Sequence, residues 1–419
     1  MYRLSCCVQN NAWGKYGSES VVALLAQQSH GYTIDEALPY AELWMGAHPK
    51  HPSTLKNGND DIEFGRWILQ NPNSLGQHVH DKYKGYFPFL FKVLSINKTL
   101  ALQAHPAQEH AKNLHKHHPE FYLDPNHKPE IAIALSKFEG LCAFRPIKEV
   151  LFYLKMVPEL RILISDEALH MLDTEASLGN SKQESMKKAL KCCFESLMKS
   201  DSIIVEMQIN LLVQKVKRSH AIGEDTSSCL GRLLLYVHEQ YPGDVGCFAI
   251  YFLNYIHLDP FESIYIAPNV PHAYISGDIV ECLASSDNVV RAAFSSKVKD
   301  VDTFCNMLDY TPRTVSDTKL EAVPDKLDEF LYLYDPPCEE FSVRKILIPA
   351  GHNMMYTLSS VAGPSILLAL SGGAEINCQN KTLNLKIGSV VFITTDLTLM
   401  LSNFSENEDN LFFQAYCSS

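Results

Sequence analysis

The sequence lacks a long hydrophobic run and any tract of low complexity. Although 46% of its 419 residues are hydrophobic, no apolar segment approaches the roughly 18 residues that a membrane-spanning helix needs. The first ten residues turn polar at Gln9 and Asn10, too early for the apolar core of a secretion signal. We therefore expect a cytoplasmic protein that does not interact with membranes.

Positive charge is also in short supply. The chain has 36 lysines and arginines against 48 aspartates and glutamates, which gives a formal net charge of −12. Such a chain is a poor partner for nucleic acid or for an anionic membrane surface. If the substrate is an anion, the cations that bind it must be gathered locally against the overall field.

Twelve cysteines are present, but none forms a CxxC pair. Most of them, such as Cys142, Cys247 and Cys282, lie among apolar neighbours. This distribution is typical of buried, reduced thiols, not of a disulfide framework or a thiolate metal site.

The length predicts two or three domains. Residues 1–145 read mainly as short β segments, with strands over 87–94 and 99–105. Apolar residues then recur at helical spacing, which predicts a helical insert over 146–245. Strands return over 246–330, and repeated alternation over 331–419 predicts a second β domain. We therefore predict a mainly β fold whose catalytic unit, 1–145 plus 246–330, is interrupted by the insert.

Three polar segments could carry chemistry. Gln103 and His105 lie two residues apart on a predicted strand, so their side chains share one face. Polar residues also crowd the segments 122–130 and 265–291. Imidazole, carboxylate and amide oxygen suit zinc with an open coordination position. The spacing alone also fits a pair of hydrogen-bonding residues, because coordination needs convergence that only the fold supplies.

Longer motifs resemble those of one enzyme family. The pattern Tyr-x-Asp-x-Asn-His-Lys-Pro-Glu, from Tyr122 to Glu130, and the block from His272 to Ala292 resemble two signatures of type I phosphomannose isomerases. Three further blocks, which begin at Trp13, Glu42 and Gln103, are similar to the same family in the same order. The resemblance implies two cupin-type jelly-roll barrels with a helical insert, the C-terminal barrel being free of metal.

The resemblance also implies an activity and a site. The activity is the isomerisation of mannose 6-phosphate and fructose 6-phosphate, which feeds mannose into GDP-mannose synthesis and glycosylation or into glycolysis, and the protein is expected to be a monomer. One zinc ion per chain would be held by Gln103, His105, Glu130 and His272. The catalytic residues implied are Arg291, Lys128 and Glu281, and the substrate and phosphate contacts are Lys92, Lys297 and Tyr274.

The chemistry requires residues of these types. Moving a proton between C2 and C1 of an open-chain sugar passes through an enediol with negative charge on oxygen. A metal polarises the oxygens, a fixed cation such as Arg291 stabilises the charge, and a base carries the proton. Glu281, Lys128 and a zinc-bound water are all candidates for that base.

The chain departs from the family pattern at two places. Ala101 stands where the family usually has a serine that contacts phosphate, so one hydroxyl donor is missing. The family's Arg-Ala-Gly-x-Thr-Pro-Lys reads Arg291-Ala-Ala-Phe-Ser-Ser-Lys297 here, and Ala293 would be strained if the glycine needs a positive φ. These changes leave open a weakened paralogue that binds sugar phosphate without efficient turnover. A cupin dioxygenase using iron is a further alternative.

Several single residues have competing interpretations. Arg291 could form a structural ion pair with Asp287, and His127 could assist opening of the sugar ring. Lys92 lies in an apolar strand, where an unpaired ammonium would be costly, which favours it as a phosphate contact. The histidines at 110, 115, 117 and 118 are predicted to lie on a solvated helix face and not to form a metal cluster.

Overall fold

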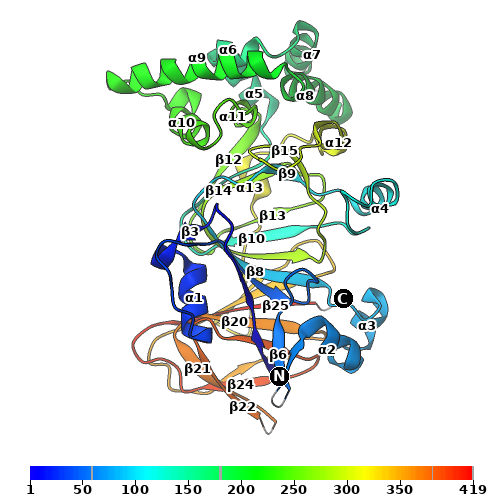
Figure 1. The fold of residues 1–419 in the computed structure, drawn as a ribbon, viewed down its shortest axis with the longest axis vertical. Helices are drawn as coiled ribbons and strands as arrows, with labels where there is room; N and C mark the ends of the chain where they lie inside the picture. The colour runs from blue at the N-terminus through cyan, green and yellow to red at the C-terminus, as the bar shows by residue number, and fades with distance from the viewer. Residues whose placement is uncertain (58–59, 179–181, 380, 418–419) are drawn as a thin grey trace.

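The computed structural model describes residues 1–57, 60–178, 182–379 and 381–417. The molecule is elongated, with the helical insert at one end and the C-terminal sheet at the other (Figure 1). A sheet of ten strands lies between them. In the described part of the chain, no helix combines the length and hydrophobicity needed to cross a bilayer.

The ten-stranded sheet is antiparallel and is organised around one long strand, β14 (His272–Ala284). The main path runs β12 (Leu253–Leu258), β11 (Phe138–Phe144), β14, β8 (Phe89–Ile96), β5 (Glu42–Gly46) and β2 (Cys7–Gln9). Branches add β9 (Leu102–Ala104), β10 (Glu130–Ala134), β13 (Ser263–Ile266) and β15 (Val290–Ala293). Every residue of β8 is buried, including Lys92 and Ser95, which interrupt an otherwise apolar strand.

The helical insert follows directly from β11. Its helices are α5 (Ile147–Met156), α6 (Pro158–Arg161), α7 (Asp166–Ser177), α8 (Gln183–Met198), α9 (Ser202–Ala221), α10 (Gly231–Gln240) and α11 (Gly246–Ala249). Ser165 and Asp201 cap the amino ends of α7 and α9 by accepting hydrogen bonds from backbone N–H groups, which favours helix initiation there. The helical spacing of apolar residues predicted for the insert is confirmed in α9, where Val205, Ile209 and Leu212 are buried.

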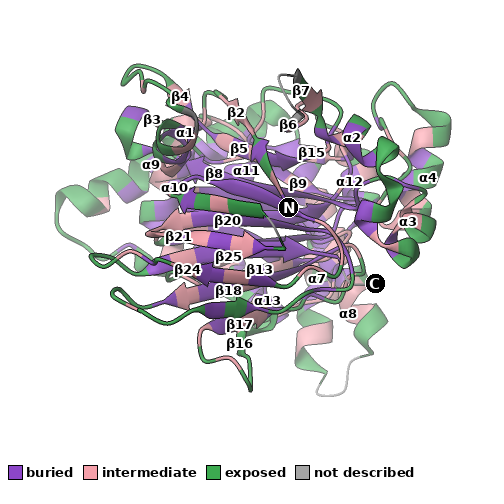
Figure 2. Ribbon diagram, turned by 90° about the horizontal axis from the view of Figure 1, so that it is seen from below, coloured by how far each residue is buried: buried purple, intermediate pink, exposed green. Residues whose placement is uncertain are grey.

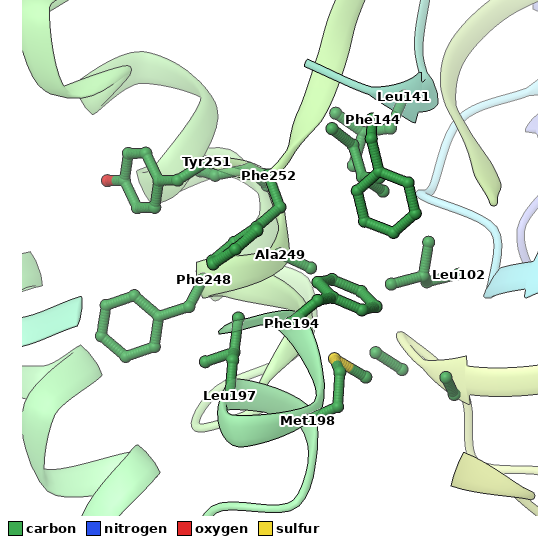
Figure 3. Close-up of a cluster of buried hydrophobic side chains, with 14 of the residues drawn as sticks. Leu102, Leu141, Phe144, Phe194, Leu197, Met198, Phe248, Ala249, Tyr251 and Phe252 are labelled. Atoms are coloured by element: carbon green, nitrogen blue, oxygen red, sulfur yellow. The ribbon is translucent and has the colours of Figure 1, made fainter. Parts of the chain in front are cut away.

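The core of the insert is continuous with the sheet that carries the site. Figure 3 shows Phe194, Phe248 and Phe252 of the insert region packed in one cluster with the sheet residues Leu102, Leu141 and Phe144. Leu102 immediately precedes Gln103 on β9. The insert therefore buttresses the strand that carries the first predicted metal ligands.

The C-terminal β unit contains two separate sheets, one of nine strands and one of four. The larger sheet contains β16 (Val323–Pro324), β17 (Leu331–Tyr334), β18 (Ser342–Ile348), β25 (Asn410–Tyr416), β20 (Ser365–Ser371) and β23 (Val390–Ile393). The smaller sheet contains β19 (Tyr356–Leu358), β24 (Leu399–Ser402), β21 (Gly373–Cys378) and β22 (Lys381–Lys386). Buried residues run along the strands of this unit and exposed residues gather in the loops around it (Figure 2).

The start of the chain is built into this C-terminal sheet. Strand β1 (Tyr2–Ser5) pairs with β23, with Tyr2 opposite Phe392, and the sheet continues through β6 (Thr54–Asn57) and β7 (Asp60–Glu63). Among the described strands neither large sheet closes on itself, so neither β unit is a closed barrel. The predicted class, two cupin-type β units with a helical insert, is confirmed.

Candidate active site

Three strand ends bring the four predicted metal ligands together. Gln103 lies on β9, and His105 is the first residue after that strand. Glu130 and His272 are the first residues of β10 and β14. Gln103 and His272 are cross-strand partners. The ligand atoms of His105, Glu130 and His272 all lie within 4.8 Å of one another. The convergence that spacing alone could not supply is therefore present.

The two imidazole rings are oriented with their Nε2 atoms toward the carboxylate of Glu130. His105 Nε2 lies 3.3 Å from Oε1 and His272 Nε2 lies 3.6 Å from Oε2. The Nδ1 atoms face backbone carbonyls, those of Asn288 at 2.7 Å and Val270 at 3.0 Å. A carbonyl only accepts, so each Nδ1 carries the proton and each Nε2 keeps a free lone pair.

A buried nitrogen without a hydrogen-bond partner is costly. Within the described residues, His105 Nε2 is such an atom. All three side chains are at most 2% exposed, so water does not compensate. A cation bound between the two Nε2 atoms and the carboxylate would satisfy all three groups, and imidazole with carboxylate is a common zinc ligand set. The residues present therefore fit a zinc ion.

The electrostatics favour the protonation states that bind metal. Burial and the neighbouring His105 ring lower the pKa of His272 to about 4. Burial, followed by the ammonium of Lys128, lowers the pKa of His105. Burial opposes ionisation of Glu130, but Lys128, at 2.8 Å, and His105 hold its pKa well below the ordinary value. Neutral imidazole and ionised carboxylate are the metal-binding forms.

Gln103 completes the set from the adjacent strand. Its side-chain amide lies 3.3 Å from His272 Nε2. With the amide turned by 180°, the side-chain oxygen would take that position and could act as a ligand.

A cavity of about 590 Å³ opens beside these ligands. Most of the predicted site residues line it: Lys92, Gln103, Lys128, Glu130, Tyr274, Glu281, Arg291 and Lys297. Ala101 also lines the cavity, so the missing hydroxyl group is a real loss at its wall. The polar lining and the size suit a small, highly hydroxylated ligand.

Lys92 is buried and is paired with two carboxylates. Its Nζ lies 3.2 Å from Glu42 and 3.4 Å from Glu281, and 4.6 Å from the centroid of the Trp44 ring. Burial opposes the charged ammonium, but the carboxylates of Glu42 and Glu281 outweigh it and raise the pKa of Lys92. Its charge is therefore partly neutralised before any ligand binds.

Glu281 is a buried carboxyl group that titrates near neutral pH. The Tyr274 hydroxyl donates to its Oε1 at 3.0 Å. Burial, together with the charge of Glu130, raises the pKa of Glu281 to about 7 against the opposing effect of Lys92 and Lys128. A group with this pKa can both accept and release a proton at physiological pH.

Arg291 extends from β15 into the same cavity and is half-buried. The ion pair with Asp287 considered above is wrong, because Asp287 instead contacts Lys50 at 3.0 Å and His48 at 3.4 Å. No carboxylate in the described residues pairs with Arg291. Burial lowers the pKa of Arg291, but a guanidinium remains charged. Its charge is available to a ligand.

In the segment after Arg291, the residue with an unusual backbone conformation is not Ala293 as expected. Ala293 has no positive φ, whereas the next residue, Phe294, has φ +52°. The Phe294 ring is buried, and a Cβ on Gly246 would come within 2.7 Å of it. Packing of this ring against α11 therefore maintains the unusual backbone. Lys297 lies exposed beyond it at the mouth of the cavity.

Some cavity residues were not identified from sequence. Glu42 and Trp44 alternate on β5, and the Trp44 indole donates to Glu42 at 2.7 Å. Their spacing of two on a strand was a usable signal, since both had to face one side. His48 and Lys50 follow them and also line the cavity.

Two histidine hypotheses can be compared with the structure. His127 lines a second cavity, of about 830 Å³, and its Nε2 contacts Glu340 at 2.7 Å; its role in ring opening stays a prediction. The histidines at 110, 115 and 117 lie on α4 (Gln108–His117), followed by His118, and none is buried. In the described chain, the triad of His105, Glu130 and His272 is the group of potential metal ligands that converges.

Fold and site together define a metal-binding protein of the cupin type, with a helical insert and a cavity that presents cations to a small polar ligand. Family comparison agrees with this class: residues 1–147 match the catalytic domain of type I phosphomannose isomerases and residues 163–253 match their helical insertion domain. The chain belongs to the type I phosphomannose isomerase family.

Three relatives matched over nearly their full length share one name. The mannose-6-phosphate isomerases of rat and human are 46% and 44% identical over 421 residues, covering 100% of this chain and 98% of each relative. The fission yeast enzyme is 38% identical with complete coverage of both chains. A solved mannose 6-phosphate isomerase described as zinc-bound matches the fold with a TM-score of 0.81 at 24% identity, covering 100% of this chain and 99% of that one.

Proposed function

We propose that this protein is a zinc-dependent mannose-6-phosphate isomerase that interconverts mannose 6-phosphate and fructose 6-phosphate. The observation that carries the proposal is the buried triad of His105, Glu130 and His272, with a free lone pair on each Nε2, beside a cavity that contains the unpaired charge of Arg291. The names of full-length relatives support the same reaction.

Zinc bound by Gln103, His105, Glu130 and His272 would polarise the carbonyl and hydroxyl oxygens of the open-chain sugar. The remaining chemistry belongs to side chains of the cavity. In the forward direction a base removes the proton from C2, and the electron pair moves to form an enediol whose charge develops on the C1 oxygen. The C2 hydroxyl then gives its proton to the C1 oxygen, and the base returns the carbon-bound proton to C1, which leaves a ketone at C2 and a hydroxyl group at C1.

Glu281 is the base that the geometry favours among the three candidates. Lys128 contacts the ligand carboxylate of Glu130 at 2.8 Å, so its side chain is already engaged by the metal site. Glu281 has a pKa of about 7 and lies on the cavity wall. We assign the proton transfer between C2 and C1 to Glu281, held in place by the Tyr274 hydroxyl.

Arg291 stabilises the charge that develops during this transfer. Its guanidinium faces the cavity without a competing carboxylate among the described residues. Its positive charge can therefore interact with the substrate. A fixed cation in a partly dehydrated site provides one of the largest contributions to catalysis.

The phosphate group is assigned to the mouth of the cavity. Lys297 is exposed there and has an ammonium that can turn toward an anion. Lys92 remains a proposed phosphate contact, although Glu42 and Glu281 already share its charge. Ala101 adds no donor, so we expect weaker affinity than a serine at that position would give, by a factor set by about 1.5–3 kcal/mol for a charge-assisted hydrogen bond.

The remaining parts of the proposal concern the whole chain. The catalytic unit comprises residues 1–145 and 246–330, with the insert over 146–245 and a metal-free β unit over 331–419. The protein acts in the cytoplasm as a monomer, without nucleic-acid or membrane partners, and supplies mannose phosphate for GDP-mannose formation or fructose phosphate for glycolysis.

The direct test is turnover of mannose 6-phosphate by the purified full chain before and after removal of metal with a chelator, and again after zinc is restored. Substrate should reach concentrations high enough to reveal the effect of Ala101. We expect turnover that is lost on chelation and recovered with zinc. A protein that holds zinc and binds sugar phosphate without turnover would instead be the weakened paralogue.

A further inference from the structure

One zinc ligand depends on a backbone carbonyl from a distant part of the chain. The Nδ1–H of His105 donates to the carbonyl of Asn288 at 2.7 Å, across 183 residues of sequence. His272 has a local arrangement, since its Nδ1–H donates to Val270, two residues earlier in the same turn. The orientation of His105 therefore relies on whatever holds residue 288 in place.

Asn288 is held by its own side chain, which is about 1% exposed. Its Nδ2 donates to the carbonyl of Asp124 at 2.6 Å and to that of Asn126 at 2.9 Å. Its backbone N–H donates to the Ser286 hydroxyl at 3.1 Å. The two side-chain bonds fasten residue 288 to the segment that leads into Glu130, and the backbone bond fixes the local turn at Ser286.

Asp124 completes the connection from the other side. Its carboxylate accepts from the Ser286 hydroxyl at 2.8 Å and from the backbone N–H groups of Asp287 and Asn126 at 2.7 and 2.9 Å. The segment 286–288 is thereby tied to 124–126 by bonds to charged or buried groups, which resist displacement because a broken bond leaves an unsatisfied partner.

We propose that Asp124 and Asn288 are positioning residues for the zinc ligand His105. They act by fixing the Asn288 carbonyl, which in turn fixes the Nδ1–H tautomer and the rotation of the ring. A ring that loses this acceptor can rotate or carry its proton on Nε2, the atom that must be free to bind metal. Outer partners of metal-ligating histidines contribute about 10- to 100-fold in metal affinity. The inference rests on the proposed zinc site and extends it to residues that do not touch metal or substrate.

The test measures zinc affinity by chelator competition in Asn288→Ala and in a matched control, Asn410→Ala. Asn410 is fully buried in the C-terminal sheet, where its side chain accepts from the N–H groups of Gly373 and Ser405 at 3.0 Å each and donates to Ile348. Both variants remove a buried asparagine that ties segments together. We expect zinc affinity to fall about 10- to 100-fold in Asn288→Ala and to stay within twofold of wild type in Asn410→Ala, with similar losses of thermal stability in the metal-free forms.

Asp124→Asn provides a milder second variant in case Asn288→Ala does not fold. It keeps the side-chain volume but places an amide N–H group where at least one N–H donor now finds an acceptor. We expect zinc affinity to fall in Asp124→Asn as well, but by less than in Asn288→Ala. In a histidine-selective ¹⁵N spectrum of the zinc-bound protein, the Nδ1–H of His105 should exchange faster with water in both variants.

Zinc affinity and proton exchange that match wild type in both variants would overturn the positioning role while leaving the isomerase intact. Wild-type protein that binds no zinc would overturn the proposed function and this inference together. The two failures are therefore distinguishable from the wild-type titration alone.

Discussion

Two residues at the cavity wall, Arg291 and Glu281, are placed in opposite electrostatic settings. The charge of Arg291 meets no carboxylate partner among the described residues, whereas Glu281 has Lys92 at 3.4 Å and the Tyr274 hydroxyl at 3.0 Å. A cation without a partner interacts most strongly with charge that appears during the reaction. A carboxyl group with a pKa of about 7 is suited to moving a proton.

Replacing Arg291 by alanine should lower kcat by about 10²- to 10³-fold, the effect of removing one preorganised charge-stabilising group. Zinc content should not change, because Arg291 lies outside the triad. Steady-state kinetics with metal analysis would measure both quantities. The control is Arg291→Lys, which keeps the charge and should recover part of the rate; full activity in Arg291→Ala would remove this residue from the mechanism.

The pH dependence of kcat/KM should report Glu281. A raised pKa means that the carboxyl is protonated, and unable to accept a proton, at pH values below about 7. The rate should therefore fall about tenfold per pH unit on the acid side of that value. Tyr274→Phe removes a donor to the ionised form, which should raise the pKa further and move the acid limb upward. If the acid limb stays at the same pH in Tyr274→Phe, a group other than Glu281 causes it.

The types of the ligand residues could be predicted from sequence, but the pairing of Lys92 could not. Its neighbours come from two other strands: Trp44 on β5 and Glu281 on β14 are both cross-strand partners of Lys92 on β8. Sequence periodicity indicates which residues share a face of one strand, but the register between strands distant in sequence depends on the whole sheet. The residues next to Lys92 along β8 therefore gave no sign of the carboxylates that pair with it.

At the scale of elements, β15 and α11 support each other through one ring. The positive φ of Phe294 is maintained because its ring fills the space above Gly246. Sequence comparison placed the strain one residue too early, at Ala293, because backbone conformation at this turn depends on a partner nearly 50 residues away.

Gly246→Ala should therefore destabilise the protein and disturb the loop that carries Lys297. The added Cβ would lie 2.7 Å from the Phe294 ring, and overpacking of this kind costs about 1–3 kcal/mol. Urea unfolding would measure the loss, and KM for the sugar phosphate should rise. Gly65→Ala is the matched control, since its Cβ would meet neighbours at an ordinary 3.5 Å; equal stability of the two variants would contradict this account.

At the scale of the whole molecule, the first strand joins the two β units. Strand β1 lies between β23 and β6 in the C-terminal sheet, and β2 follows within the ten-stranded sheet. Alternation identified the strands of residues 331–419 as a β unit, but nothing local in residues 2–5 indicates which distant strand they pair with. Such pairings are decided by burial in the completed fold.

Leu4→Ala should lower the free energy of unfolding by about 2–5 kcal/mol, the usual cost of truncating a fully buried leucine. Leu4 is 1% exposed and packs in one cluster with Val22, Leu55 and Phe392. Leu327, at 98% exposure, provides the control, and its replacement by alanine should change stability by less than about 0.5 kcal/mol. Equal effects in urea unfolding would show that β1 is not part of the cooperative core.

The pairing of β1 with β23 also sets an order of events during synthesis. Residues 2–5 are synthesised long before their partners at 390–392. At about 5–20 residues per second, β1 waits roughly 20 to 80 seconds for its neighbour. In that interval β6 is the neighbour available to β1, so the β1–β23 part of the sheet forms late.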